Sequence, residues 1–513
     1  MILSTLLLPQ PALGCGGFLC SNAQPIVQNA ERIVFDLGDG EVQAHVQIFY
    51  EGPSTEFAWI VPVATEPELF ASPQALFNVL PIATGPVFQL NQVIEGNCRT
   101  RGIESAAQAP VFSNGSSTDV TVVSEGQVGP FDTLVLQASS DVALLDYLQA
   151  NGYDLPDTLD AALAPYIAEE AYFVALKLQS DRNSGDITPL GMRYAGDSAS
   201  VPIQLTSLAA APDTRLEVYV FAEERAVPTS YLHVQINDAA IDWWTGGLNY
   251  PEVITVAADE AGGHAFATDF AGDPAFLQNV VYKGSWGEGG LLDQTTPEDW
   301  VDHLRRVLPG SPEMENIIDE VLQSTDPFDP VRWTAVVQER IVRPLEDIEE
   351  MFRSAYLTRL TSSLDADEMT VDPIFETNPD MSVPAFDVAQ VRSADLVFEC
   401  RRGKTMDKVD RRLELADGRV IALPSQAWFT DQRITEIEYL SDLGATKAQV
   451  IEQTGTSGVP EVLFDATQEL AALVDAHNGR LLGCRCSSTG GTLPGSLALF
   501  GLLGLGARRR RQR

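Results

Sequence analysis

Apolar and polar residues alternate along residues 30–63, and this pattern predicts β-strands around which the rest of the chain is organised. The apolar side chains recur at every second position: Ile33, Phe35, Val42, Ala44, Val46, Ile48, Phe57, Trp59 and Val61. Between the first two runs, residues 38–40 (Gly-Asp-Gly) tolerate the positive φ of a tight hairpin turn. We therefore predict an antiparallel ribbon whose apolar face is covered by later parts of the chain.

Helical periodicity appears in two later segments. A helix is predicted over residues 251–260, and Gly262-Gly263 should end it and release residues 264–270 into an extended run. From residue 296 to residue 364 the apolar period becomes helical, and Pro344 should break or kink the last helical stretch.

Changes in composition divide the chain into segments. Residues 365–384 are acidic and contain prolines, which is typical of a linker. After them, a hairpin with Asp417-Gly418 as its turn and helical patterns at 445–454 and 466–477 indicate a smaller unit. The predicted fold class is α+β: an antiparallel β-rich N-terminal region with a helical section, a smaller α+β module and a C-terminal transmembrane segment. The predicted boundaries are 1–14 for a signal peptide, 15–364 for the exported domain, 365–384 for the linker, 385–483 for the module and 484–513 for the tail.

One cluster of polar residues is a candidate for chemistry. Asp259, Glu260, His264 and Asp269 lie close together in sequence around the predicted helix end, where they could form an acid–base or metal site. The alternative is a helix C-terminus whose polar groups satisfy the turn. The sequence has no zinc-protease motif, nucleophile elbow, phosphate-binding loop or dinucleotide fingerprint, so it assigns no catalytic residue.

Two further features could serve ligand binding. The loop at residues 180–186 contains oxygen ligands suited to calcium, but it lacks the order of an EF-hand, which favours a solvated turn over a calcium site. No cofactor is predicted besides this calcium site. Trp243, Trp244 and Trp286 could form an exposed aromatic patch for a surface ligand, or they could belong to the core.

The net charge of -39 argues against a nucleic-acid partner, because a phosphate backbone would be repelled. Such acidity also keeps a protein soluble, and it does not by itself identify a ligand.

Six cysteines lie mostly near the ends of the chain: Cys15, Cys20, Cys98, Cys400, Cys484 and Cys486. An apolar run at residues 2–8, followed by Ala-Leu-Gly before Cys15, indicates a signal peptide. Export would place the cysteines in an oxidising compartment, where pairing is expected. Four residues separate Cys15 from Cys20, which favours a structural bridge over redox chemistry, and lipidation of Cys15 is the weaker alternative. We expect Cys400 to pair with Cys484 and so to close the small module.

The tail combines Cys484 and Cys486, an uncharged apolar run at 492–507 and a cluster of arginines at 508–511. The run is short for a spanning helix, and the arginines would leave all earlier residues outside the cytoplasm. This order resembles the MYXO-CTERM sorting tails, which a membrane protease recognises and cuts near the cysteine. The resemblance implies that Cys484 or Cys486 is processed and that the membrane and a sorting protease are partners. A plain membrane anchor is the alternative.

Three longer motifs occur within about residues 15–364: CGGFLC, AHVQIFYEGPSTEFAWIVPV and VAADEAGGHAFATDFAG. Through them the body of the chain resembles the domain-of-unknown-function family 2330 of exported bacterial proteins. The resemblance implies no catalytic residues. Our leading hypothesis is a non-catalytic binding or structural protein of the cell envelope. The alternative is an exported hydrolase, with or without a metal, whose site lies near Glu260 and His264.

Overall fold

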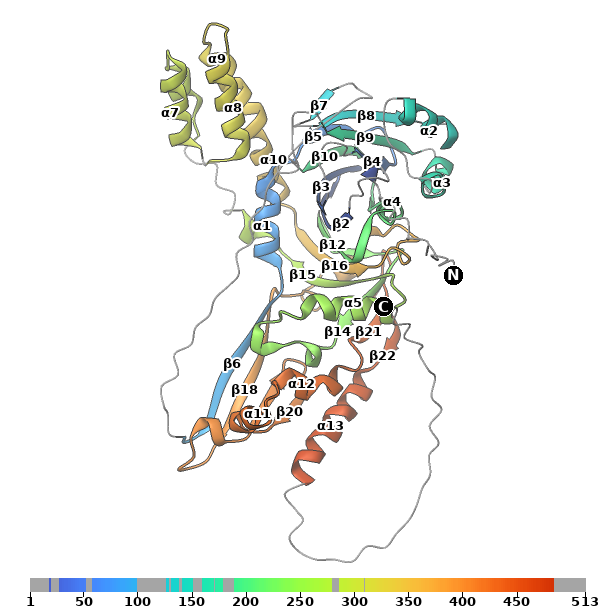
Figure 1. The fold of residues 1–513 in the computed structure, drawn as a ribbon, viewed down its shortest axis with the longest axis vertical. Helices are drawn as coiled ribbons and strands as arrows, with labels where there is room; N and C mark the ends of the chain where they lie inside the picture. The colour runs from blue at the N-terminus through green and yellow to red at the C-terminus, as the bar shows by residue number, and fades with distance from the viewer. Residues whose placement is uncertain are drawn as a thin grey trace, which may run out of the picture.

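The computed structural model describes residues 18–19, 27–51, 58–98, 126–128, 131–137, 141–150, 159–169, 171–178, 189–278, 286–308 and 310–483. A large mixed sheet forms the middle of the molecule, with a smaller sheet and a helical lobe at one end of the long axis and an elongated lobe at the other (Figure 1). The ten strands of the large sheet are, in spatial order, β22 (Glu461–Asp465), β21 (Ala448–Gln453), β14 (Leu232–Ile236), β15 (Ala265–Gly272), β16 (Tyr356–Leu364), β12 (Ala210–Ala222), β2 (Val27–Gly38), β3 (Glu41–Glu51), β10 (Leu190–Ala195) and β5 (Glu68–Ala71).

The predicted hairpin is confirmed in β2 and β3. They pair in antiparallel register through a turn in which Asp39 (φ 54°) and Gly40 (φ 75°) both take left-handed conformations, as a tight hairpin requires. The predicted third strand is β4 (Ala58–Val63), but it leaves the ribbon and joins a second, five-stranded sheet. The other strands of that sheet are β1 (Phe18–Leu19), β9 (Tyr172–Leu178), β8 (Phe131–Gln137) and β7 (Gly126–Val128).

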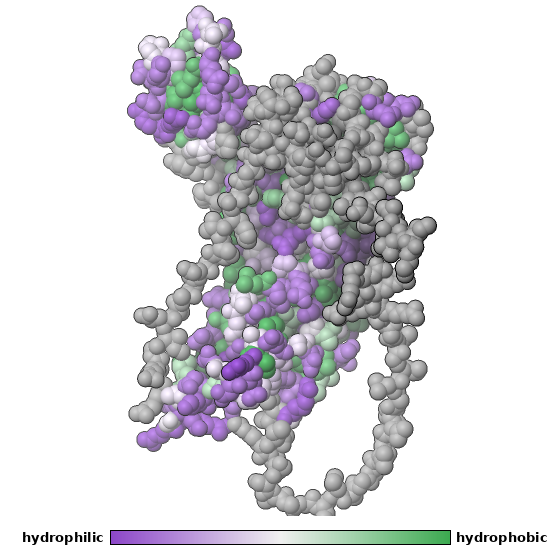
Figure 2. Space-filling view, in the orientation of Figure 1, coloured by the Kyte–Doolittle hydropathy of each residue, from purple (hydrophilic) through white to green (hydrophobic). Residues whose placement is uncertain are grey.

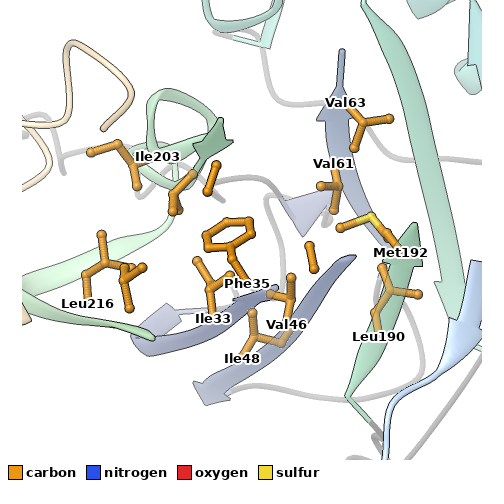
Figure 3. Close-up of a cluster of buried hydrophobic side chains, with 14 of the residues drawn as sticks. Ile33, Phe35, Val46, Ile48, Val61, Val63, Leu190, Met192, Ile203 and Leu216 are labelled. Carbon is orange, nitrogen blue, oxygen red and sulfur yellow. The ribbon is translucent and has the colours of Figure 1, made fainter. Parts of the chain in front are cut away.

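The two sheets face each other across an apolar core. Phe35 on β2 and Val61 on β4 are 2% and 3% exposed, so the strand that leaves the ribbon supplies part of the cover that the ribbon needs (Figure 3). The outer face of the five-stranded sheet is covered by α2 (Asp141–Ala150), α3 (Leu159–Ala168) and α4 (Ile203–Thr206).

The other face of the large sheet is buried under helices. Val34, Tyr219 and Phe221 point into this second core. The helices are α1 (Gln74–Thr84), α6 (Glu288–Leu292), α7 (Pro297–Val307), α8 (Pro312–Gln323), α9 (Pro330–Val337) and α10 (Arg343–Met351). A π-helical turn, Gln338–Val342, lies directly before α10, in which Pro344 is the second residue, so the winding of the helix changes next to the proline while the helix continues. Residues 356–364 form β16 rather than a helix, because they pair with strands on both sides in the centre of the sheet.

The elongated lobe combines residues from distant parts of the chain. Its four-stranded sheet consists of β20 (Val420–Leu423), β19 (Arg411–Leu415), β18 (Val391–Cys400) and β6 (Val87–Gly96). The helices that pack with it are α5 (Tyr250–Glu260), α11 (Gln426–Gln432), α12 (Glu436–Leu440) and α13 (Thr467–Gly483). Short 3-10 turns occur at Asp238–Ala240, Trp243–Thr245, Ala275–Leu277, Pro379–Met381, Met406–Lys408 and Ser441–Gly444.

Residues 385–483 are therefore not a separate module. β6 pairs with β18 in parallel, while β21 and β22 extend the large sheet, and β21 occupies a segment predicted to be helical. The helix predicted at 466–477 is present as α13. The predicted linker is also part of the fold, because β17 (Ile374–Thr377) pairs with β11 (Ala199–Ser200) and β13 (Ala226–Pro228).

A disulfide joins Cys98 to Cys400, which corrects the expected Cys400–Cys484 bridge. The parallel register places Gly96 opposite Cys400, and the Cα atoms of Cys98 and Cys400 are 5.0 Å apart, within bridging distance. Cys15, Cys20, Cys484 and Cys486 lie outside the described residues, as do the signal peptide and the tail. Among the residues that the structure describes, no helix is both long and apolar enough to cross a membrane.

Candidate functional site

The helix end predicted to carry chemistry is present, but its carboxylates have structural partners. α5 ends at Glu260, and Gly262 and Gly263 take left-handed conformations that redirect the chain into β15. Oε2 of Glu260 accepts a hydrogen bond of 2.8 Å from the backbone N–H of Ala448 at the start of β21. Glu260 thus fixes a neighbouring strand to the helix end.

His264 and Asp259 border a loop at residues 365–370. Nε2 of His264 lies 2.6 Å from the carbonyl oxygen of Glu368 and 3.1 Å from the hydroxyl of Thr370. Desolvation raises the pKa of Asp259, and the charge of the nearby Glu368 raises it further. His264 is thereby occupied in holding this loop against the start of β15.

Asp269 lies in the protein core. The register between β15 and β16 shifts between Thr268 and Phe270, which makes Asp269 the extra residue of a β-bulge. The bulge directs its carboxylate, which is 0% exposed, toward the hydroxyl of Thr361, which donates a hydrogen bond of 2.6 Å. The hydroxyl of Tyr250 on α5 donates to the same carboxylate.

Arg359 connects Asp269 to a second buried carboxylate. Its guanidinium lies 3.2 Å from Asp269 and 3.5 Å from Glu217, and it also donates to the carbonyl oxygen of Pro81 in α1. Arg32 donates a 2.9 Å hydrogen bond to Glu217 from the neighbouring strand. Burial alone would raise the pKa of Glu217, but the charges of Arg359 and Arg32 hold it below its usual range.

These contacts separate the residues that the sequence grouped together. Asp269 is five positions along β15 from His264, about 16 Å at the usual rise of a strand, and it belongs to an ion network in the centre of the large sheet. Asp259, Glu260 and His264 lie near one turn, but neither of the two cavities described below is lined by them. The predicted acid–base constellation is therefore not assembled by the described residues.

No metal site is evident in the part of the chain that the structure describes, where no three His, Cys, Asp or Glu side chains are arranged to hold an ion. The loop at 180–186 lies outside this part, so its calcium site stays a prediction.

The tryptophans do not form an exposed patch. Trp243 is 2% exposed and packs edge-on against Phe88 in the core of the elongated lobe. Trp244 is half-buried against the same core, and Trp286 is half-buried against the helical lobe.

A hollow of about 240 Å³ lies at the end of the β2–β3 hairpin. Four carboxylates border it: Asp39, Asp197, Glu223 and Glu224. The remaining lining comes mainly from backbone at Gly38, Gly40 and Gly196. This concentration of negative charge disfavours anionic ligands, and no described basic side chain lines the hollow.

A buried carboxyl group that the sequence analysis missed is that of Glu31. It lies two residues before Ile33 on the apolar face of β2 and borders a cavity of about 20 Å³, room for about one water molecule. Its carboxylate accepts a hydrogen bond of 3.1 Å from the Gln28 amide and a second hydrogen bond from the side chain of Thr206, and both donors are neutral. Desolvation raises the pKa of Glu31 to about 7. The available signal was a charged residue in phase with apolar ones in an alternating strand.

Comparison with known proteins gives one family. A family model described as "Uncharacterized protein conserved in bacteria (DUF2330)" matches residues 9–376, well over half of the chain. No curated protein matches. Among solved structures, the crystal structure of baculovirus P35 is similar at 10% sequence identity and a TM-score of 0.22, over 43% of this chain and 69% of that chain. A similarity this slight does not indicate a shared function.

Proposed function

The chain belongs to the DUF2330 family of uncharacterized proteins conserved in bacteria, and from this premise we propose that it is an exported protein anchored at the membrane or cell surface. Its role in the envelope is binding or structural rather than catalytic. The family match confirms the resemblance of the body, whereas the tail at 484–513 lies beyond the matched residues.

The observation that carries the proposal is the Cys98–Cys400 disulfide. Disulfides persist in the bacterial periplasm and at cell surfaces, whereas cytosolic thiols are kept reduced. The apolar run at residues 2–8 before Ala-Leu-Gly-Cys15 gives the same compartment independently.

The proposed lack of catalytic activity is supported by the structural contacts that each candidate residue makes. Glu260 fixes β21, His264 holds the 365–370 loop, and Asp269 neutralises Arg359 in the core. Hydrolysis by two carboxylates or by a metal needs side chains that converge on substrate, and these side chains diverge.

The anchor that we propose is the tail, cut at Cys484 or Cys486 and linked there to lipid. The intact mass of the mature protein from the membrane fraction, measured with and without reduction, tests this. The expected mass ends near one of these cysteines, carries a lipid-sized adduct and gains two hydrogens on reduction for each disulfide.

Cys484→Ser and Cys486→Ser identify the processed residue, because only one of them should prevent cleavage. Cys98→Ser is the matched control, since it removes a cysteine without touching the tail. A mature mass that still includes Arg513 would show that the tail is not cut, which would favour a plain membrane anchor over the sorting tail. Recovery of the protein from the cytosol with Cys98 reduced would refute export.

A further inference from the structure

The parallel ribbon of β6 and β18 ends in a basic tip at residues 401–408. Directly after Cys400, Arg401, Arg402 and Lys404 are all exposed, and they are grouped by a tight turn in which the N–H of Lys404 donates 3.0 Å to the carbonyl of Arg401. Gly403 takes a left-handed conformation (φ 88°) that this turn needs. The disulfide holds the tip to the end of β6.

The charge of this tip is opposite to that of the molecule. Residues 401–408 contain four basic residues and one acidic residue, whereas the whole chain carries -39. Among the described residues, Arg401, Arg402 and Lys404 make no ion pair. The nearest acidic residues on the strands, Glu95 and Glu399, are both engaged by Arg412, at 2.6 and 3.7 Å.

Exposed apolar side chains lie on β6 a few residues before the tip, opposite Val397 and Phe398 of β18. Val93 and Ile94, the last apolar residues of β6 before the tip, are 37% and 48% exposed on an edge strand. Basic residues next to exposed aliphatic ones are the composition that binds the interface of an anionic bilayer.

The tip also lies at the end of the molecule from which the tail departs. In Figure 1 the ends of β6 and β18 and the end of α13 at Gly483 all lie at the lower end of the long axis, opposite to α7–α9. The chain beyond Gly483 begins the proposed anchor, so an anchored molecule presents this end to the membrane. The surface of the elongated lobe is largely hydrophilic there (Figure 2), which suits contact with headgroups rather than deep insertion.

We propose that the tip at residues 401–408 is a second membrane contact, which docks on the headgroups of anionic lipids and fixes the tilt of the anchored protein. This inference rests on the proposed anchoring for its geometry. Charges more than about 8 Å from the bilayer are largely screened at physiological salt, so a projecting cationic tip can bind although the protein as a whole is acidic.

Protection from trypsin tests the proposal on the wild-type full-length protein, because Arg401, Arg402 and Lys404 are trypsin sites. The protein is added to vesicles of phosphatidylcholine, with or without phosphatidylglycerol, and cleavage at the tip is followed by mass spectrometry after reduction. Cleavage at Arg306, at the end of α7 and at the opposite end of the molecule, is the internal control. We expect anionic vesicles to slow cleavage at the tip at least tenfold relative to Arg306, and high salt to abolish the protection.

Flotation of the protein with vesicles distinguishes the proposed tip contact from the proposed membrane anchor. The variant R401A/R402A/K404A should lose at least tenfold in anionic-over-neutral preference, whereas R305A/R332A/R343A, with the same change in charge at the opposite end, should keep it. If the protein floats with neutral vesicles but anionic vesicles do not protect the tip from trypsin, the proposed tip contact is refuted and the proposed anchor is kept. If the protein floats only with anionic vesicles, and the tip variant does not float, the proposed anchor is refuted and the proposed tip contact is kept. Displacement by inorganic phosphate, or binding of the tip to an immobilised acidic polymer but not to vesicles, would overturn the lipid assignment.

Discussion

Replacing Glu31 by Gln should make the protein more stable at neutral and alkaline pH, although it removes a charge from a strongly acidic chain. Glu31 is 5% exposed between the two sheets, and its hydrogen-bond donors, Gln28 and Thr206, are neutral. Gln keeps the shape of the side chain and an oxygen for these bonds, but it never ionises.

The magnitude follows from the pKa of Glu31, which desolvation raises to about 7 from its ordinary value of 4.5. Below the lower value the carboxyl is protonated in both the folded and the unfolded chain, and it costs nothing. As pH rises from 4.5 to 7 the unfolded chain releases the proton first, so folding loses about 3 kcal/mol at 1.36 kcal/mol for each pH unit. Above pH 7 the loss is complete.

Urea unfolding followed by tryptophan fluorescence, at pH values from 5 to 8, measures the difference between E31Q and wild type. The advantage of E31Q should grow by about 2.5 kcal/mol across this range, because a small part of the effect is already present at pH 5. Glu66→Gln is the control, because Glu66 is exposed on the surface, and its stability should follow that of wild type. Parallel curves for E31Q and wild type would show that the carboxyl of Glu31 is solvated and that the reasoning is wrong.

Three further results are expected. Arg359→Met should destabilise the protein by about 3–5 kcal/mol in urea unfolding, because it leaves the buried carboxylate of Asp269 without its counter-charge and leaves Glu217 paired with Arg32. A smaller loss than for the exposed Arg353→Met control would contradict the network. Cys98→Ser should lower the free energy of unfolding by about 2–5 kcal/mol relative to the oxidised wild type. It should also leave one additional free thiol, on Cys400, and an unchanged count of free thiols would mean that Cys400 pairs with another cysteine. Glu260→Ala should cost about 1 kcal/mol through the lost hydrogen bond to β21, and any hydrolase activity that vanished with it would revive the catalytic alternative.

Local patterns were sufficient to predict the hairpin and the helix before His264. In β2 and β3 the alternation of apolar residues coincides with the face buried in the core, and the turn residues require positive φ, so both signals lie within a few residues. α5 likewise ends where the paired glycines begin.

Pairing between distant segments could not be predicted in the same way. β6 has few buried side chains, and its partner β18 comes about three hundred residues later, so no local period relates them. The same is true of the disulfide, because the register of that parallel pair, and not the spacing of cysteines, selects Cys98 as the partner of Cys400.

The candidate site failed for a related reason. Asp269 follows His264 closely in sequence, but a one-residue bulge in β15 directs it into the core, where Arg359 from another strand neutralises it. A bulge depends on the pairing of two strands, which sequence proximity does not reveal.

The long separation between β6 and β18 also sets the order of events during synthesis. Asn91 on β6 and its partner Asp395 on β18 are 304 positions apart, so at roughly 5–20 residues per second the first strand waits about 15–60 s for the second to emerge from the ribosome. During that interval β6 and the apolar residues meant for the elongated lobe have no native cover. The chain cannot complete its fold until nearly all of it has been made. It therefore stays unfolded for most of its synthesis, and an unfolded chain is what a secretion channel requires.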